Sequence, residues 1–410
     1  MKSGLNFLVA ARQCEIVELE RLARTCELAG RIGRLVHALQ RERGVSSLYL
    51  GSQGERSGDQ LARQRLASDA RQQEVLAWFD GLETEAGRMP NGARLFARIA
   101  VAIQGLQMLP ATRLRIDRLQ PGTAEATAAY SRLIAQLLAA VFEAADNAGD
   151  PEISRALVAM FSFMQGKEFA GQERAFGSAV FASGRVEAST RHDWQHLIDL
   201  QHGSLQVFLD FCDPGVLAIE HASHDAELAG EIERLRRVGW APPTPHEAGA
   251  MLGQTWYEAC TRRLDAMRTV EDALAANLRR VCERRMAQAR EELRDQQALL
   301  AELDRRQSEA PPNAPPSHYG PNLERSIVTM VQDQSRRLQA MSDELDAVKS
   351  TLNERKLVER AKGLLMAHRQ LTEEEAHKML RTTAMNQNRR LVDVAEAILT
   401  TADVLPGRTR

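Results

Sequence analysis

Apolar residues recur at helical spacing over most of the chain, and residues 1–305 show no alternation of strand and helix patterns. The clearest case is a proline-free stretch from about residue 251 to residue 307. Its apolar residues lie three, four and seven positions apart: Leu264, Met267, Leu274, Leu278 and Val281. Because this spacing places them on one helix face, we predict a single long helix here and an all-α fold.

Clusters of proline divide the chain. The segment EAPPNAPPSHYGPN, residues 309–322, has five prolines in fourteen residues, which remove backbone donors and prevent a helix from continuing. A shorter break, WAPPTPHE, occupies residues 240–247. We therefore predict a large N-terminal helical domain over residues 1–305, a proline-rich linker over 306–322 and a smaller C-terminal part.

A heptad pattern follows the linker. The a and d positions are occupied by Ile327, Val331, Gln334, Leu338, Met341, Leu345, Val348 and Leu352. This pattern predicts a short coiled coil over residues 323–356, and a coiled coil needs a partner strand. A parallel homodimer is the preferred interpretation, and an amphipathic helix packed on its own chain is the alternative.

Composition agrees with these patterns, since 44% of the residues are hydrophobic and only 5% are aromatic. The 53 Lys and Arg residues nearly balance the 55 Asp and Glu residues, so any basic surface has to be local. The five cysteines are odd in number and form no CxxC pair, which argues against a disulfide framework or a zinc site. No run of about 18 apolar residues occurs. We expect a cytoplasmic protein with reduced thiols and no membrane segment.

Three short helices are predicted from Leu357 onward, which defines a C-terminal module over residues 357–410. Thr372 and Glu375 form a capping box at the start of the second helix, and the third begins after Asn388. From Lys356 to the end, ten basic residues oppose seven acidic ones. One face of the module can therefore be positive, although a solvated surface of mixed charge is the alternative.

The segment ERAKGLLMAHRQLTEEEAHKMLRTTAMNQNRRLVDVAEAIL closely resembles the ANTAR family of RNA-binding antitermination domains. The residues that carry this resemblance are Ala361-Lys362-Gly363, Leu365-Met366, Glu375-Ala376, Leu380-Arg381, Ala384-Met385, Arg389-Arg390-Leu391 and Asp393-Val394-Ala395. The resemblance implies binding to paired hairpins in leader RNA, which prevents a transcription terminator from forming. A three-helix RNA-binding module is the expected structure.

Candidate RNA contacts follow from the residue types in this module. Lys and Arg side chains supply backbone contacts, whereas sequence-specific recognition usually targets unpaired bases. The candidate cations are Lys362, Arg381, Arg389 and Arg390. Gly363 would let RNA approach the backbone closely, and Ala384 and Met385 would pack against splayed bases. The alternative is that Gly363 serves helix packing and that Met385 belongs to the core.

Cations occupy positions in the N-terminal domain where core residues are expected. The apolar stripe Ile32, Val36, Leu39 continues at i+4 onto Arg43, and a second stripe starting at Ile153 leads to Lys167 and Arg174. Burying an unpaired charge is costly, so such a side chain must reach solvent, find a carboxylate or bind an anion. Pairing with a Glu on a neighbouring helix remains the alternative, and Arg236 is a weaker third candidate.

Two segments around these cations, QRERGVSSLYLGSQG (40–54) and KEFAGQERAFGSAVFASG (167–184), resemble the NIT domain, a helical nitrate- and nitrite-sensing module. The resemblance covers roughly residues 30–300. It implies paired four-helix bundles that hold nitrate or nitrite among arginines, with no other cofactor. Arg43 and Arg174 are the first candidates for nitrate binding, followed by Arg236 and Arg41. The planar guanidinium fork suits a planar anion with three acceptor oxygens.

Together, the two resemblances imply a cytoplasmic, homodimeric regulator that responds to nitrate or nitrite. It would bind leader RNA hairpins and prevent transcription termination at nitrogen-assimilation genes. Catalysis has little support, because residues 1–305 contain no Gly-rich phosphate loop and no Ser/His/Asp order. We therefore expect no catalytic residues and no enzymatic activity.

Other classes of protein remain open from the residues alone. A metal sensor is suggested by His192 and His196 at i and i+4 and by His221 and His224, but HDWQH lacks the Glu of HExxH and a third ligand. Surface histidines are favoured, so no metal site is expected. A metal- or other-ligand-sensing DNA-binding regulator would also suit three short basic helices. A structural coiled-coil adaptor would explain the long helices but not the inward arginines.

Overall fold

The computed structural model describes residues 4–55, 57–82, 92–146, 149–183, 188–240 and 246–308 and, with gaps, residues between 332 and 404. The chain divides into two compact units, Met1–Arg337 and Leu338–Arg410. The proline-rich segment 309–322 lies outside the described residues. Both units are helical, and the described residues include no strand, which confirms the predicted all-α class.

The helices of the N-terminal unit are long. They are α1 (Gly4–Gly51), α2 (Gly58–Asp80), α3 (Gly92–Asp117), α4 (Thr123–Asp146), α5 (Pro151–Ser183), α6 (Ala188–Phe211), α7 (Pro214–Ser223), α8 (Ala226–Gly239) and α9 (His246–Ser308). The single long helix predicted over 251–307 is α9, which has 63 residues. Its start after the prolines at 242–245 agrees with the helix-breaking role of that segment.

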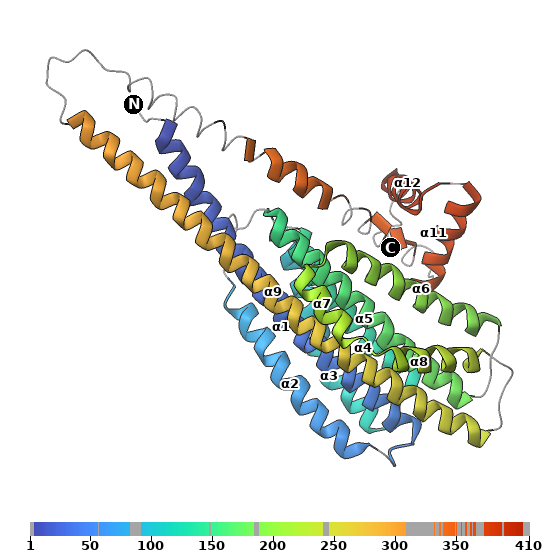
Figure 1. Ribbon diagram of the computed structural model, residues 1–410. Helices are drawn as coiled ribbons and strands as arrows, with labels where there is room; N and C mark the ends of the chain where they lie inside the picture. The colour runs from blue at the N-terminus through green and yellow to red at the C-terminus, as the bar shows by residue number, and fades with distance from the viewer. Residues whose placement is uncertain are drawn as a thin grey trace. The chain divides into compact units, whose positions relative to one another are not determined.

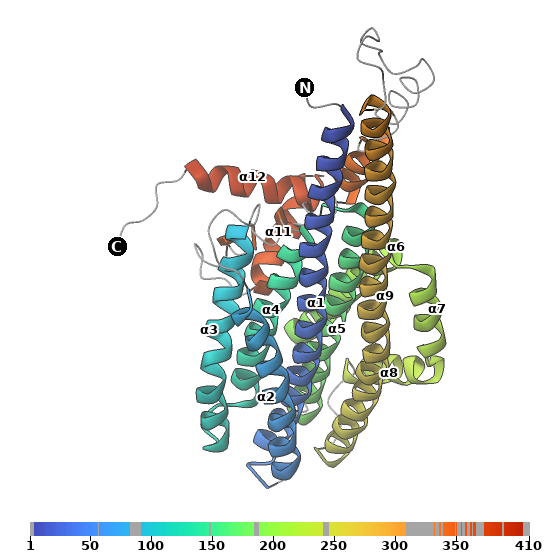
Figure 2. The same cartoon turned by 90° about the vertical axis from the view of Figure 1, so that its left-hand side faces the viewer.

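These helices form two groups, α1–α4 and α5–α9, and the second contains the short α7 in addition to four longer helices. In the first group, α1 packs on α2 and α4, and α4 packs on α3. In the second, α5 packs on α6, α8 and α9, while the short α7 packs on α9. The two groups are joined because α1 runs along α9, as both Figure 1 and Figure 2 show, and because α1 also contacts α5.

Helix α3 is both long and apolar in sequence. By length and composition alone, Ala93–Asp117 could cross a membrane, although only 28% of its most apolar window is buried. Within the unit, Ile99 and Leu106 belong to the core shared with α4. The Arg113 side chain reaches across to the carboxylate of Glu42 on α1. These contacts are those of a bundle helix.

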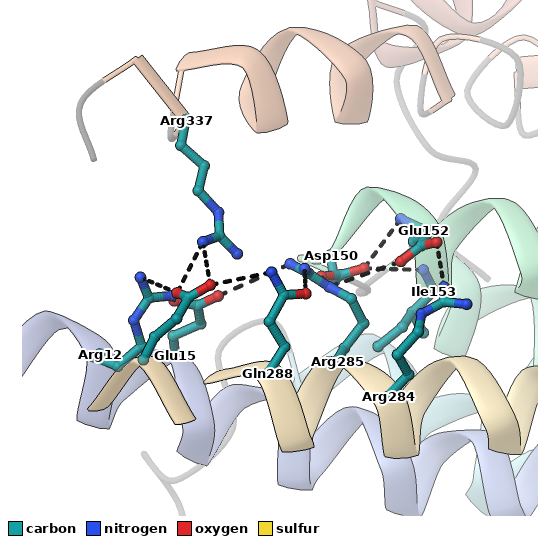
Figure 3. A network of polar contacts seen from close by, with 10 residues as sticks. Arg12, Glu15, Asp150, Glu152, Ile153, Arg284, Arg285, Gln288 and Arg337 are labelled. Carbon is teal, nitrogen blue, oxygen red and sulfur yellow. Dashed lines mark hydrogen bonds and ion pairs between the residues drawn. The ribbon is translucent and has the colours of Figure 1, made fainter. Parts of the chain in front are cut away.

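An ion-pair network ties α1, α5 and α9 together away from the inward arginines (Figure 3). Arg12 of α1 pairs with Glu292 of α9 at 2.5 Å, and Arg337 places Nη1 2.8 Å from both oxygens of the same carboxylate. Arg285 of α9 pairs at 2.8 Å with Asp150, which caps the start of α5. The network therefore fixes the register of three long helices.

The C-terminal unit contains α11 (Glu373–Gln387) and α12 (Leu391–Val404), preceded by helical residues at 357–358, 361–362 and 364–365. Its core consists of Ala361, Leu365, Ala376, Leu380, Ala384, Val394 and Ala395. In the turn between the helices, the N–H of Arg389 donates to the carbonyl of Ala384 at 3.0 Å, which closes α11. The N–H of Arg390 donates to the Asp393 carboxylate at 3.3 Å and begins α12.

This arrangement confirms the second and third predicted helices of the C-terminal module. The capping box at Thr372 and Glu375 lies outside the described side chains. The coiled coil is described only in part: residues 339–348 are helical, Val348 is buried, and Met341 and Leu345 are half-buried. Its homodimeric form stays a prediction.

An aromatic cluster holds the second group of helices together. The rings of Trp194 on α6 and Trp256 on α9 meet edge to face at 5.2 Å, and Phe181 of α5 packs against both. Gly177 of α5 makes room for this contact, because a Cβ there would lie 2.4 Å from the Trp256 ring. The close approach of α5 and α9 therefore requires glycine at this position.

We expect Gly177→Ala to lower the free energy of unfolding by about 1–3 kcal/mol, because the buried Trp256 ring has to move. Gly203→Ala is the matched control, since its Cβ would meet nothing within 4 Å, and it should gain about 0.5–1 kcal/mol. Urea unfolding followed by tryptophan fluorescence measures both. Equal stability of the two variants would contradict the packing described.

Candidate anion-binding and nucleic-acid-binding sites

The inward arginines predicted from the apolar stripes are buried. Arg43 on α1 is 1% exposed and Arg174 on α5 is 3% exposed. Lys167, one of the two cations expected on the same face of α5, is fully buried. The prediction that these cations point into the protein is confirmed.

Arg43 and Arg174 lie in one interhelical space, because each helix offers a glycine to the arginine of the other. A Cβ on Gly44 of α1 would lie 2.5 Å from Nη2 of Arg174. A Cβ on Gly171 of α5 would lie 2.5 Å from Nη2 of Arg43. Any side chain at either position would displace a guanidinium, so the small residues allow two cations from different segments to approach.

Arg43 has a carboxylate partner. Its Nη1 and Nη2 donate to the two oxygens of Glu168 on α5 at 2.5 and 3.2 Å, and Nη1 also donates to Ser131 Oγ on α4 at 2.8 Å. Glu168 also accepts hydrogen bonds from Nε2 of Gln40 and of Gln172, at 2.9 and 3.0 Å. The alternative of an Arg–Glu pair between neighbouring helices therefore holds for Arg43.

Arg174 differs, because its hydrogen bonds go to neutral oxygens. Nη1 donates to Thr261 Oγ1 at 3.0 Å and Nη2 donates to the carbonyl of Gln40 at 3.1 Å, while the guanidinium lies 4.9 Å from the centre of the Tyr257 ring. Within the described part of the chain, no carboxylate forms an ion pair with it. Burial lowers the pKa of Arg174, and the positive charge of Arg43 lowers that pKa further.

Two guanidinium cations and one carboxylate thus leave this cluster with one net positive charge. Gln40 connects its two halves, because its carbonyl accepts from Arg174 while its side chain donates to Glu168. The Oε1 atom of Gln40 and the Nε atom of Arg43 are buried and have no hydrogen-bond partner in the described structure. The Arg43 Nε–H is a free donor beside a net positive charge, which is a feature of a site that can accept an anion, whereas the Gln40 oxygen can only accept a hydrogen bond.

The other two candidate arginines lie elsewhere. Arg236 of α8 is buried but forms a bidentate pair with Glu173, at 2.7 and 2.8 Å. Burial alone would raise the pKa of Glu173, but Arg236 and hydrogen bonds from Gln201 and Trp194 lower it below its ordinary value. Arg41 is exposed. The geometry therefore favours Arg43 and Arg174 over Arg236 and Arg41.

Lys167 has its own partners beside the arginine cluster. Its Nζ lies 2.6 Å from Glu271 Oε2 on α9 and 3.0 Å from His37 Nδ1 on α1. Burial, followed by the charge of Lys167, lowers the pKa of His37 to about 2. The imidazole is therefore neutral and accepts a hydrogen bond from the ammonium.

Sequence analysis missed Glu168, Gln40 and Glu271. A weak signal was present for the first two, since Gln40 lies three residues before Arg43 and Glu168 three before Gly171, on the same helix faces. No local signal pointed to Glu271, because its partner Lys167 lies 104 residues away. Glu42, the residue next to Arg43, takes no part in the cluster, because it accepts hydrogen bonds from Arg113 and Tyr130.

In the C-terminal unit, four of the candidate RNA contacts form an open surface. Arg381, Arg389 and Arg390 are exposed, and Met385 is 71% exposed, so the alternative that Met385 belongs to the core is wrong. Arg390 forms an ion pair with Glu354. We define these four residues as the basic surface.

Two candidate contacts need correction. Ala384 is 6% exposed because it lies four residues after Leu380 on the buried face of α11, so it cannot pack against splayed bases. Lys362 is 3% exposed and lies beside the buried Ala361, so its ammonium is not on the open surface. Gly363 lies outside the described residues.

Comparisons with known proteins decide the family. The model of the family described as nitrate and nitrite sensing (NIT) matches residues 34–279, which is more than half of the chain. The chain belongs to the NIT family. Its NIT domain contains the whole arginine cluster, including Glu168 and Thr261.

The C-terminal unit matches the ANTAR domain family over residues 346–399. This match begins within the segment predicted as a coiled coil, so it starts earlier than the module predicted from residue 357. The chain therefore joins a NIT domain to an ANTAR domain, which is the architecture of a nitrate-responsive antitermination regulator. The matching families and relatives are regulatory proteins.

Two known proteins are similar to this chain over nearly its whole length. The nitrate regulatory protein of Klebsiella oxytoca is 35% identical over 97% of this chain and 94% of its own length. A solved structure of the NasR transcription antiterminator is similar, with 32% identity, a TM-score of 0.61 and coverage of 98% of this chain and 99% of that one. The transcriptional regulatory protein PdtaR of Mycobacterium tuberculosis is 39% identical over 66 residues, which are 16% of this chain and 32% of PdtaR.

The histidines considered as metal ligands form no cluster in the part of the NIT domain that is described. No group of three or more His, Cys, Asp or Glu side chains is placed there to hold a metal ion. His192 is exposed on α6, and His196 is half-buried.

The depressed pKa of His37 predicts a pH dependence of stability. The folded value of about 2 lies below the ordinary 6.5, so the stabilising contribution of neutral His37 is complete above pH 6.5 and is lost as the pH falls below it. His37→Asn keeps an acceptor for Lys167 but does not titrate. Relative to this variant, we expect the wild-type free energy of unfolding to fall by at most about 1.4 kcal/mol per pH unit below 6.5. Parallel urea-unfolding profiles between pH 7 and pH 5 would contradict this assignment.

Proposed function

We propose that this protein binds nitrate or nitrite between α1 and α5 at Arg43 and Arg174. In the bound state it engages leader RNA hairpins through the basic surface of its ANTAR domain and prevents transcription termination at nitrogen-assimilation genes. The observation that carries the proposal is the net positive charge shared by two buried guanidinium groups from different helices.

The chemistry of the arginine cluster favours a small planar anion. Nitrate has three acceptor oxygens in one plane, and the guanidinium fork presents parallel N–H donors to two of them. The glycines at 44 and 171 leave no Cβ between the two cations. The neighbouring donors are the hydroxyls of Thr261 and Ser131 and the side-chain Nε2 of Gln40, which can form hydrogen bonds to oxygen.

Anion binding can change the packing of the helices. Without a ligand, the charge of Arg174 has no carboxylate partner among the described residues where α1 meets α5, and an anion bound beside it neutralises this charge. A ligand shifts a conformational equilibrium only through such differential affinity for two states. Helix α9 contacts the cluster through Thr261 and Tyr257 and ends at Ser308, before the proline-rich segment. It is the helix through which we propose that the change reaches the ANTAR domain.

The proposed RNA contact rests on the basic surface. Arg381 on α11 and Arg389 and Arg390 in the turn after it are exposed, and Met385 offers an exposed apolar side chain four residues after Arg381 on the same helix. This combination provides phosphate contacts together with a surface for an unstacked base. We further propose a homodimer through the heptad segment, which would bring two ANTAR domains to paired hairpins.

The anion site is tested by Arg174→Ala in the full-length chain. We expect calorimetric titration to show nitrate affinity reduced on the order of 30-fold, equivalent to about 2 kcal/mol. Because Arg174 pairs with no carboxylate in the described structure, its removal leaves no buried carboxylate without a partner. Arg41→Ala, which alters an exposed arginine nearby, is the control and should bind nitrate normally. Wild-type affinity in Arg174→Ala would refute the proposed site.

The RNA surface is tested by Arg389→Ala at saturating nitrate. Loss of one phosphate contact should weaken binding to a two-hairpin leader RNA and reduce the salt slope of log K by roughly 0.7–1. Lys362→Met removes a buried charge and should leave that slope unchanged. Duplex DNA of the same sequence should bind more weakly than RNA. Preference for the duplex would support a DNA-binding regulator instead.

A further inference from the structure

We propose that Glu168 determines the charge selectivity of the anion site. Because Glu168 stays paired with Arg43, the cluster has one positive charge left, that of Arg174. The site therefore binds one monovalent anion at Arg174 and excludes divalent oxyanions such as sulfate and phosphate. This inference rests on the proposed function, since it assumes that nitrate binds at Arg43 and Arg174.

Glu168 is held as a fixed part of the site. Its side chain is buried, and both of its oxygens accept hydrogen bonds, from Arg43, Gln40 and Gln172. Its two carboxylate oxygens accept from Nη1 and Nη2 of Arg43, one from each. A carboxylate in that position occupies the donors that a planar anion would otherwise take, so Arg174 is the guanidinium left for the ligand.

The other buried charges of α1 and α5 near the cluster each form an ion pair. Each neighbouring pair joins two helices: Lys167 with Glu271, Glu42 with Arg113, and Glu173 with Arg236. Arg43 and Glu168 also cancel each other. In the described structure, the charge without a carboxylate in this region of α1 and α5 is therefore that of Arg174, which amounts to one positive charge.

The size of this charge decides which anion is favoured. A buried charge without compensation is costly, so the best ligand is the one that brings the cluster to neutrality. Nitrate and nitrite carry one negative charge and do so. Sulfate carries two and would leave the buried cluster negative next to the Glu168 carboxylate. Chloride has the right charge but lacks the planar set of acceptors that the guanidinium fork matches.

Replacing Glu168 by Gln should therefore change selectivity as well as affinity. Glu168→Gln is nearly isosteric and raises the charge of the cluster to two, which a divalent oxyanion then neutralises. We expect the ratio of the sulfate Kd to the nitrate Kd to fall by at least about tenfold, or about 1.4 kcal/mol. The measurement is calorimetric titration of the full-length chain with nitrate, nitrite, sulfate and chloride in a buffer free of other small anions.

Two variants separate the charge of Glu168 from its structural role. Glu168→Asp keeps the charge and should keep the wild-type preference for nitrate over sulfate, even if its affinity falls. Glu42→Gln makes the same substitution at a buried glutamate adjacent to Arg43 that binds Arg113 and Tyr130 instead. It should lower stability and leave the ratio unchanged.

The outcomes distinguish this inference from the proposed function. If Arg174→Ala loses nitrate binding while folded Glu168→Gln keeps the wild-type ratio, charge selection by Glu168 is refuted and the nitrate site stands. If Arg174→Ala binds nitrate normally, the site itself is wrong. Circular dichroism establishes that each variant is folded. Should Glu168→Gln fail to fold, the wild-type chain still provides the test, because sulfate binding as tight as nitrate binding would overturn the inference.

Discussion

The contact between two buried arginines and two glycines determines how α1 meets α5. Arg43 and Arg174 each lie against the backbone of the opposite helix, where Gly44 and Gly171 carry no side chain. Because a guanidinium cannot lose its charge at ordinary pH, this contact requires either a carboxylate or an anion at the same place. Of these two arginines, only Arg43 has a carboxylate partner among the described residues, Glu168. The contact between the two helices therefore carries one net positive charge.

Buried ion pairs join most helices of the NIT domain. Each pair joins two helices that are distant in sequence. A shift in the register of either helix would leave a buried charge without its partner. These pairs are Glu42–Arg113 between α1 and α3, Arg43–Glu168 between α1 and α5, Lys167–Glu271 between α5 and α9, and Glu173–Arg236 between α5 and α8. Such pairs contribute more to a unique arrangement than to net stability, because their desolvation offsets much of their attraction. Arg174 departs from this pattern, and departures of this kind are expected at functional positions.

The ANTAR domain uses its charges differently. Its small core is made of alanine and branched aliphatic side chains, whereas its arginines lie at the surface around the turn between α11 and α12. There they are exposed to solvent, and Arg390 pairs with Glu354. Arginine is therefore buried beside a carboxylate in the NIT domain and exposed in the ANTAR domain.

The sequence by itself determined the helical class, the long α9, the two resemblances and the inward direction of Arg43, Lys167 and Arg174. These follow from periodicity and local motifs, which act over a few residues along one helix. Within the C-terminal module the same reasoning located α11 and α12, but it could not separate Ala384 from Met385. Neighbouring residues on a helix face different directions, and only the packing of the other helices decides which direction is buried.

Tertiary structure alone decided which partner each buried charge has. Glu168 lies 125 residues from Arg43, and Glu271 lies 104 residues from Lys167, so no local pattern could pair them. It also separated Arg236 and Arg41 from the arginine cluster, and it showed that Arg174 forms no ion pair with a carboxylate within the described structure. The physical reason is that charge compensation depends on distances between helices, which the hydrophobic pattern of each single helix does not specify.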